Sequence, residues 1–221
     1  PECSGEELYV QYCAVCHDTG TYGRYDPFFK KFIPAIRGSS LVQLATAEYI
    51  EQNIHLGRPG TLMAGWSPEV GGLRPEEIAK LGDYLLTTPL SRTDCLPPEV
   101  VSVAHDLARR VQGNPQRGGA IFNRHCVACH GPEGEGRLGP ALNNLTLQKT
   151  ASDGFLFATI GYGRRNTVMP GFLAPDRGGL NESDVADLVA HVRSLGIETR
   201  ATLTASGESA GRELVAKETN P

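Results

Sequence analysis

The pattern Cys-x-x-Cys-His occurs twice in this chain of 221 residues, as CAVCH at 13–17 and as CVACH at 126–130. With six cysteines and six histidines in the chain, roughly 0.004 chance matches to the pattern are expected. Residues three apart share one face of a helix, so each motif would present two thiols to one object, with an imidazole directly behind them. The two motifs therefore limit the possible folds, because the fold must bring the two thiols and the imidazole of each motif to one site.

The motifs belong to a longer internal repeat. They are 113 residues apart, and beyond them the offset becomes 106, because the first copy carries seven extra residues between 18 and 33. IHLGRPGTLMAGW at 54–66 then aligns without gaps with IGYGRRNTVMPGF at 160–172. A repeat of this length has the size of a small domain and predicts duplication of a whole domain.

We accordingly expect four segments. Residues 1–92 and 114–196 are the two domains, 93–113 is a linker with the apolar spacing of a short helix, and 197–221 is a C-terminal extension rich in Ser, Thr, Gly and Ala. Helical patterns dominate in both copies and strand signals are weak, so the predicted fold class is mostly α. The chain lacks an apolar run long enough to span a membrane and lacks a basic run, which argues against nucleic-acid binding.

Three kinds of site use cysteines at this spacing. Zinc would take two thiolates and a histidine, but its second cysteine pair normally follows at short spacing. A thiol–disulfide exchange site needs a strand–helix context that is missing from the pattern, and it leaves the histidine without a role. Covalent haem attachment uses all three residues, with two thioethers to the vinyl groups and the histidine on the iron. Two aligned copies favour two haem c groups, attached at Cys13, Cys16, Cys126 and Cys129 with His17 and His130 as proximal ligands.

The chain has only two methionines, Met63 and Met169, and they occupy matching positions in the repeat. A lone methionine is more often core filler. Both of these lie in a turn-like Gly-x-x-Thr-x-Met-x-Gly context rather than on an apolar helix face, which favours thioether ligation of the iron. Each haem is thus expected to have one histidine and one methionine as axial ligands.

With these residues the sequence resembles class I cytochromes c in tandem, specifically the c-four group of dihaem electron carriers. The resemblance runs from Gly5 to Gly196 and is carried by GGAIFNRHCVACHGPEGEG, GPAL and TVMPGF. It implies a small helical fold around each haem, with the first helix crossing the last. It also implies that the carbonyl groups of Pro34 and Pro140 accept a hydrogen bond from the proximal histidine of their own domain.

The resemblance implies roles for six further residues. Arg58 and Arg164 would face haem propionates, or else lie as solvated loop arginines. Trp66 and Phe172 would pack against the haem edge and exclude water. Cys3 and Cys95 would form a disulfide that closes the first domain, since haem c attachment belongs to an exported compartment; free thiols or a lipid anchor at Cys3 are the alternatives.

Two protein ligands on each iron leave no open coordination position, so the expected role is electron transfer and not catalysis. The expected partners are redox proteins such as a dehydrogenase, terminal oxidase, reductase or photosynthetic centre. The expected location is the bacterial periplasm or the outer face of the cytoplasmic membrane, with membrane association only through a partner or a removed segment. A tightly bound electron-transfer subunit of a larger respiratory or photosynthetic complex is the alternative, and a dihaem cytochrome c peroxidase is a third.

Overall fold

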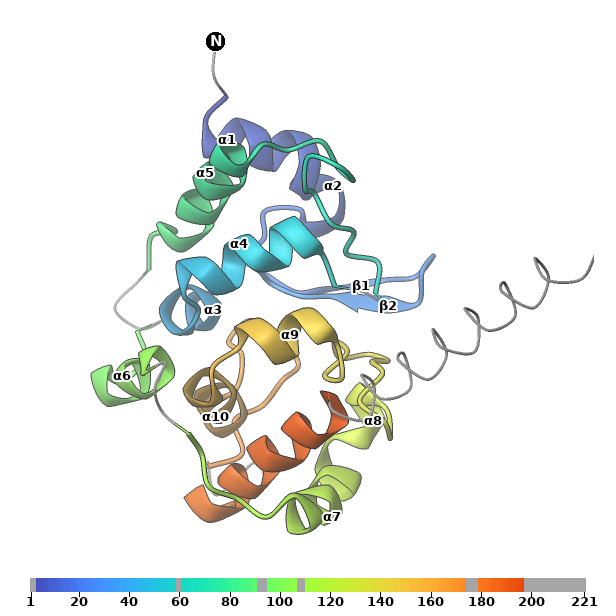
Figure 1. The fold of residues 1–221 in the computed structure, drawn as a ribbon, viewed down its shortest axis with the longest axis vertical. Coiled ribbons are helices and arrows are strands. Elements are labelled where there is room, and N and C mark those ends of the chain that lie inside the picture. Colours follow the sequence, from blue (N-terminus) through green and yellow to red (C-terminus); the bar gives the residue numbers. More distant parts are fainter. Residues whose placement is uncertain (1–2, 59–60, 91–94, 107–109, 174–178, 197–221) are drawn as a thin grey trace, which may run out of the picture.

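The structure is a computed structural model that describes residues 3–58, 61–90, 95–106, 110–173 and 179–196. Figure 1 shows two helical units stacked along the long axis of the molecule. We call residues 3–90 the N-terminal unit and residues 110–196 the C-terminal unit. The mostly helical fold class predicted from the sequence is confirmed, while the extension 197–221 lies outside the described residues.

The two units contain corresponding helices. The N-terminal unit has α1 (Gly5–Leu8), a π-helical turn (Tyr9–Cys13), α2 (Ala14–His17), β1 (Arg24–Asp26), β2 (Lys31–Ile33), α3 (Ser39–Leu44), α4 (Ala47–Leu56) and α5 (Pro75–Leu86). The C-terminal unit has α7 (Pro115–His125), α8 (Val127–His130), α9 (Leu145–Thr150), α10 (Asp153–Tyr162) and a last helix over 182–196. Between them lies α6 (Pro98–His105).

The start of each central helix follows from its sequence. The side chain of Thr46 accepts a hydrogen bond from the backbone N–H of Tyr49 at the start of α4, and Ser152 does the same for Phe155 at the start of α10. These caps occupy the same position in the two copies of the repeat. α5 begins with Pro75, a residue that suits the first helical turn because its missing N–H would have no helical partner.

In each unit the first helix crosses the last at a glycine. A Cβ added to Gly5 would collide with the backbone carbonyl of Lys80 on α5, and one added to Gly118 would collide with that of Asp187. Aromatic rings pack beside both crossings, with Tyr9 against Tyr84 and Phe122 against His191. The crossing that the family resemblance implied is therefore present twice, and its close approach depends on the missing side chain.

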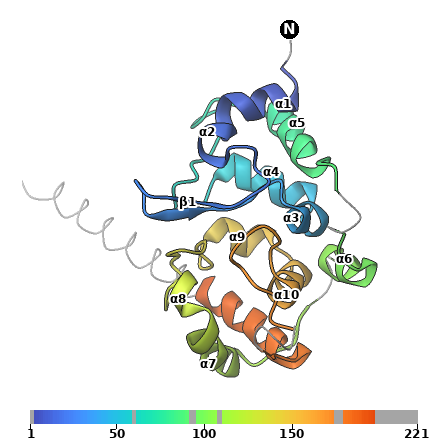
Figure 2. The ribbon, with the colours of Figure 1, turned by 180° about the vertical axis from the view of Figure 1, so that it is seen from behind.

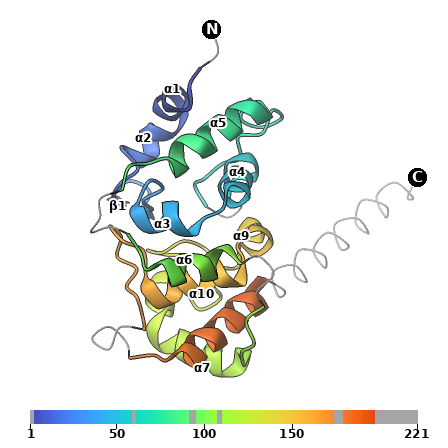
Figure 3. The same cartoon turned by 90° about the vertical axis from the view of Figure 1, so that its left-hand side faces the viewer.

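One hydrophobic cluster extends across both units. Helices α3 and α4 face α9 and α10 across the boundary, and one cluster of buried side chains runs through all four (Figure 1). α10 is apolar on every side, with Phe155, Leu156 and Phe157 all buried, as expected of a helix enclosed by other elements. One of those elements is α6, which packs along α10 and also reaches α3 (Figure 3).

The segment with seven extra residues forms a β-hairpin that the sequence patterns did not predict. β1 and β2 are antiparallel, with Tyr25 opposite Phe32. The hairpin runs along the boundary between the units (Figure 2). The Nζ of Lys31 lies 3.5 Å from the carbonyl oxygen of Gly136 in the C-terminal unit. Phe28, at the tip, is 84% exposed.

Candidate haem sites

Each Cys-x-x-Cys-His motif begins at the N-cap of a short helix, with Cys13 before α2 and Cys126 before α8. Cys13 and Cys126 are partly buried. Burial, with a smaller contribution from the neighbouring Cys16 or Cys129, raises the pKa of Cys13 to about 11 and that of Cys126 to about 12. A reactive exchange thiol needs a lowered pKa. The raised pKa of the first cysteine in each motif is the opposite of what thiol–disulfide exchange requires.

Each motif histidine is held by a carbonyl oxygen of its own unit. The Nδ1 of His17 lies 3.2 Å from the carbonyl oxygen of Pro34, and the Nδ1 of His130 lies 2.8 Å from that of Pro140. A carbonyl can only accept, so Nδ1 carries the hydrogen and Nε2 keeps its lone pair for a metal. Burial lowers the pKa of both histidines, while the carbonyl contact opposes this shift. The neutral imidazole that a metal ligand requires is thus the favoured form.

The two methionines lie in loops of the same conformation. The backbone N–H of Met63 donates to the hydroxyl oxygen of Thr61 at 3.1 Å, and the carbonyl of Met63 accepts from the N–H of Arg58 at 2.8 Å. Met169 makes the equivalent two contacts, at 3.1 Å and 3.0 Å. Gly57 and Gly163, which end the preceding helices, both have positive φ. Both methionines are therefore placed by backbone contacts rather than by core packing.

Aromatic residues after the methionines pack against the motif helices. Trp66 lies against Tyr12, with ring centroids 5.3 Å apart. Phe172 lies against His125 at 5.8 Å. Both pairs join the methionine loop to the residue directly before the first motif cysteine. This places Trp66 and Phe172 between the two halves of each candidate haem site and gives His125 a packing role.

Arg58 and Arg164 are placed at the boundary between the units, each with a buried Nε. Neither Nε has a hydrogen-bond partner within the described part of the chain. Burial lowers the pKa of Arg164, with Arg58 adding to the effect and Tyr49 opposing it. Two nearby cationic donors without an anionic acceptor fit a group that brings carboxylates, such as the propionates of haem. The buried Nε atoms of these two arginines are therefore the structural observation that fits a bound haem.

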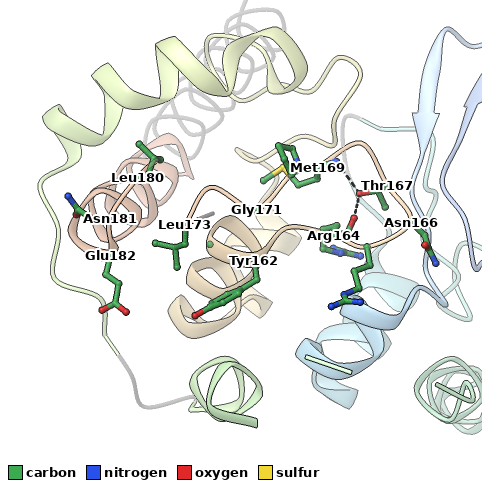
Figure 4. Close-up of a pocket in the computed structure, with 13 residues that line it drawn as sticks. Tyr162, Arg164, Asn166, Thr167, Met169, Gly171, Leu173, Leu180, Asn181 and Glu182 are labelled. Atoms are coloured by element: carbon green, nitrogen blue, oxygen red, sulfur yellow. Dashed lines mark hydrogen bonds between the residues drawn. The ribbon is translucent and has the colours of Figure 1, made fainter. Parts of the chain in front are cut away.

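A pocket of about 880 Å³ opens beside Met169 (Figure 4). It is lined by the methionine loop, the end of α10 and the start of the last helix, with Tyr162, Arg164 and Leu180 among its walls. None of the motif residues Cys126, Cys129 and His130 lines it. The pocket therefore covers only the methionine side of the second site.

Cys3 and Cys95 are both exposed, and their pairing stays a prediction. Among the described residues, three or more His, Cys, Asp or Glu side chains do not gather where they could hold a metal ion. Zinc ligation by one motif together with nearby side chains is therefore not supported by the geometry.

Each unit matches a family of known proteins. Residues 3–85 match the family model described as cytochrome c oxidase, cbb3-type, subunit III, and residues 115–196 match the one described as cytochrome c. Together these matches cover more than half of the chain.

Two relatives resemble the chain over most of its length. These are the cbb3-type cytochrome c oxidase subunits FixP of Bradyrhizobium sp. (strain ORS 278) and of Bradyrhizobium diazoefficiens, each 26% identical over 203 residues. Each alignment covers 87% of this chain and 60% of the relative, so the chain spans about 60% of the length of these proteins. A chain of a reducing HAO-like protein complex of Kuenenia stuttgartiensis is 21% identical, over 86% of this chain and 94% of its own, with a TM-score of 0.45.

The described helices include none that is both long and apolar enough to cross a membrane. The paired motifs, the carbonyl-held histidines and the two family matches agree on one kind of protein. The chain is a dihaem class I cytochrome c, built from two tandem cytochrome c domains that each carry one covalently bound haem c.

Proposed function

We propose that this cytochrome transfers single electrons through two haems with the same ligand set. The observation that carries the proposal is that both domains have a carbonyl-held histidine and a backbone-fixed methionine loop at matching positions. The first haem is attached at Cys13 and Cys16, with His17 and Met63 as axial ligands. The second is attached at Cys126 and Cys129, with His130 and Met169.

The chemistry that haem supplies here is one-electron exchange at an iron with both axial positions filled. The chain orients the imidazoles through Pro34 and Pro140 and restricts water near the methionine loops through Trp66 and Phe172. A thioether ligand raises the reduction potential relative to a second histidine. A filled coordination sphere also argues against peroxidase chemistry, because peroxide needs a position on the iron.

We further propose that the chain works as a subunit of a larger respiratory oxidoreductase on the periplasmic side of the cytoplasmic membrane. The likeness to FixP over 87% of the chain supports this assignment, as does the match of residues 3–85 to the cbb3-type subunit III family. The hairpin offers a contact surface, since Tyr22, Tyr25, Phe28 and Phe29 are all exposed on it. Exposed aromatic residues are enriched where proteins bind one another.

Haem content and ligation test the first proposal. A pyridine haemochrome assay on the purified protein should give two haems c per chain. The oxidised protein should show a methionine–iron charge-transfer band accounting for both haems, and peroxidase turnover should be absent after partial reduction. One haem per chain, or peroxide turnover by the half-reduced protein, contradicts the proposal.

Co-purification tests the second proposal. After mild detergent extraction of native membranes, the protein should migrate with a larger oxidoreductase. Phe28→Ser together with Phe29→Ser should weaken this association, whereas Val70→Ser, at an exposed residue outside the hairpin segment, should not. A protein recovered only as a monomer from the periplasmic fraction would identify it as a diffusible carrier instead.

A further inference from the structure

The two domains exchange a reciprocal pair of hydrogen bonds. The Nη2 of Arg58 in the first domain lies 3.1 Å from the carbonyl oxygen of Ala141 in the second. The Nη2 of Arg164 in the second domain lies 3.4 Å from the carbonyl oxygen of Ala35 in the first. Arg58 aligns with Arg164, and Ala35 with Ala141, at the same offset of 106 residues. The contact is therefore one interaction made twice, once in each direction.

Each acceptor carbonyl adjoins the residue that orients a proximal histidine. Ala141 follows Pro140, whose carbonyl oxygen holds His130 at 2.8 Å. Ala35 follows Pro34, whose carbonyl oxygen holds His17 at 3.2 Å. Both alanines are buried, with Ala35 1% exposed and Ala141 3% exposed, so these short segments have little freedom to adjust. By donating to Ala141, Arg58 therefore also restrains the peptide next to the carbonyl that holds His130. Arg164, by donating to Ala35, does the same for the peptide next to the carbonyl that holds His17.

Besides Nη2, each guanidinium group has further N–H donors. The Nη1 of Arg58 faces the hydroxyl of Tyr49 and the amide oxygen of Asn53, both at 3.4 Å. The Nε atoms of Arg58 and Arg164 are buried without a partner among the described residues. Arg58 thus makes hydrogen bonds both within its own domain and across the boundary.

We propose that Arg58 and Arg164 are positioning residues that form a reciprocal clasp, in which each arginine sets the environment of the haem in the other domain as well as in its own. Nη2 restrains the proline segment behind the opposite proximal histidine, and Nε donates to a haem propionate at the boundary between the domains. The two reduction potentials are then adjusted together, because neither haem site is complete within one domain.

The clasp rests on the proposed His/Met ligation, so the test first establishes which haem is which. Met63→His should lower the potential of one haem and abolish its methionine methyl resonance in the paramagnetic NMR spectrum, which assigns the first haem. A spectrum without two shifted methionine methyl signals in the unmodified protein contradicts the ligation proposal itself. The effects of the arginine variants are interpreted only after this assignment. A failure of the ligation proposal can therefore be told apart from a failure of the clasp.

Arg58→Met is the main variant, and potentiometric titration of the holoprotein is the main measurement. Loss of a cation near both haems stabilises the oxidised states, so both potentials should fall, that of the second haem included. Arg58→Lys retains the charge but not the forked geometry, so the potentials should fall less while the Met169 methyl resonance still moves. Arg164→Met and Arg164→Lys should give the corresponding results, with the effect across the domain boundary now seen in the potential of the first haem and in the Met63 methyl resonance.

Arg74→Met is the matched control, because Arg74 is a 56% exposed arginine at the N-cap of α5 that pairs with Glu76 and Glu77. It should leave both potentials unchanged. If Arg58→Met shifts only the haem of its own domain, each arginine serves one site and the clasp is wrong. If neither potential moves, the arginines only pack. Should Arg58→Met fail to assemble with haem, the Met169 resonance in Arg58→Lys decides between the same outcomes.

Discussion

Tyr49 and Phe155 stack across the boundary between the two domains, with ring centroids 4.7 Å apart and ring planes at 36°. They occupy the same position in the two copies of the repeat, so the duplicated surface packs against itself. α3 contacts α10 while α4 contacts α9, which is the reciprocal pattern of a two-fold interface. The two domains of the one chain are thus arranged like the subunits of a symmetric dimer.

Replacing Phe155 by alanine should strongly reduce stability. The side chain is 4% exposed and contacts both domains, so its loss leaves a cavity that costs about 3–5 kcal/mol. Urea unfolding followed by circular dichroism measures the change. Phe28→Ala, at a ring that is 84% exposed, should stay within about 0.5 kcal/mol of the unmodified protein. Equal effects of the two variants would mean that the interface contributes little.

Replacing Gly118 by alanine should destabilise the second domain, because the new Cβ meets the backbone carbonyl of Asp187 at the helix crossing. We expect a loss of about 1–3 kcal/mol, measured by thermal unfolding of the holoprotein. Gly119→Ala is the control on the same helix, since its Cβ would meet only the ring of His191, at 3.3 Å. Here the gain in helix propensity, about 1 kcal/mol, offsets the contact. A milder effect at Gly118 than at Gly119 would contradict the crossing.

Arg193 joins the last helix to α9 and α10. Its guanidinium donates to the carboxylate of Asp153 at 2.8 Å and to the carbonyl oxygens of Gln148 and Ala151 at 3.0 Å and 2.6 Å. Arg193→Met leaves these largely buried acceptors unpaired and should cost about 3 kcal/mol in the free energy of unfolding. Arg74→Met removes two ion pairs, with Glu76 and Glu77, of a side chain that is 56% exposed, and should cost less than about 1 kcal/mol. Comparable losses would show that the Arg193 contacts are dispensable.

Replacing either methionine by alanine should open one iron to external ligands. Reduced Met63→Ala and Met169→Ala should each bind carbon monoxide at one haem, because the sixth ligand has been removed. The change is read as a difference spectrum before and after adding the gas. Val168→Ala, next to Met169 and 65% exposed, should bind none. A methionine variant that remains inert to carbon monoxide would show that another residue ligates that iron.

Several features of the fold could be predicted because they repeat. The motif cysteines, the histidines and the only two methionines recur at fixed offsets, and the dominance of helical patterns in both copies predicted the mostly helical fold. The hairpin over Arg24–Asp26 and Lys31–Ile33 was missed. Its strands have three residues each, too short for alternation to be visible, and they are stabilised partly by contacts with the other domain.

The sequence by itself determined the chemistry of this protein, because covalent haem attachment depends on which residues stand next to one another along the chain. Tertiary structure decided how the two sites are related. Arg58 and Arg164 look like ordinary loop residues in their own repeats, and their partners Ala141 and Ala35 carry no side-chain signal, since the acceptors are backbone carbonyls. A contact between residues 83 or 129 positions apart arises only when the domains pack, so it could not be read from either copy alone.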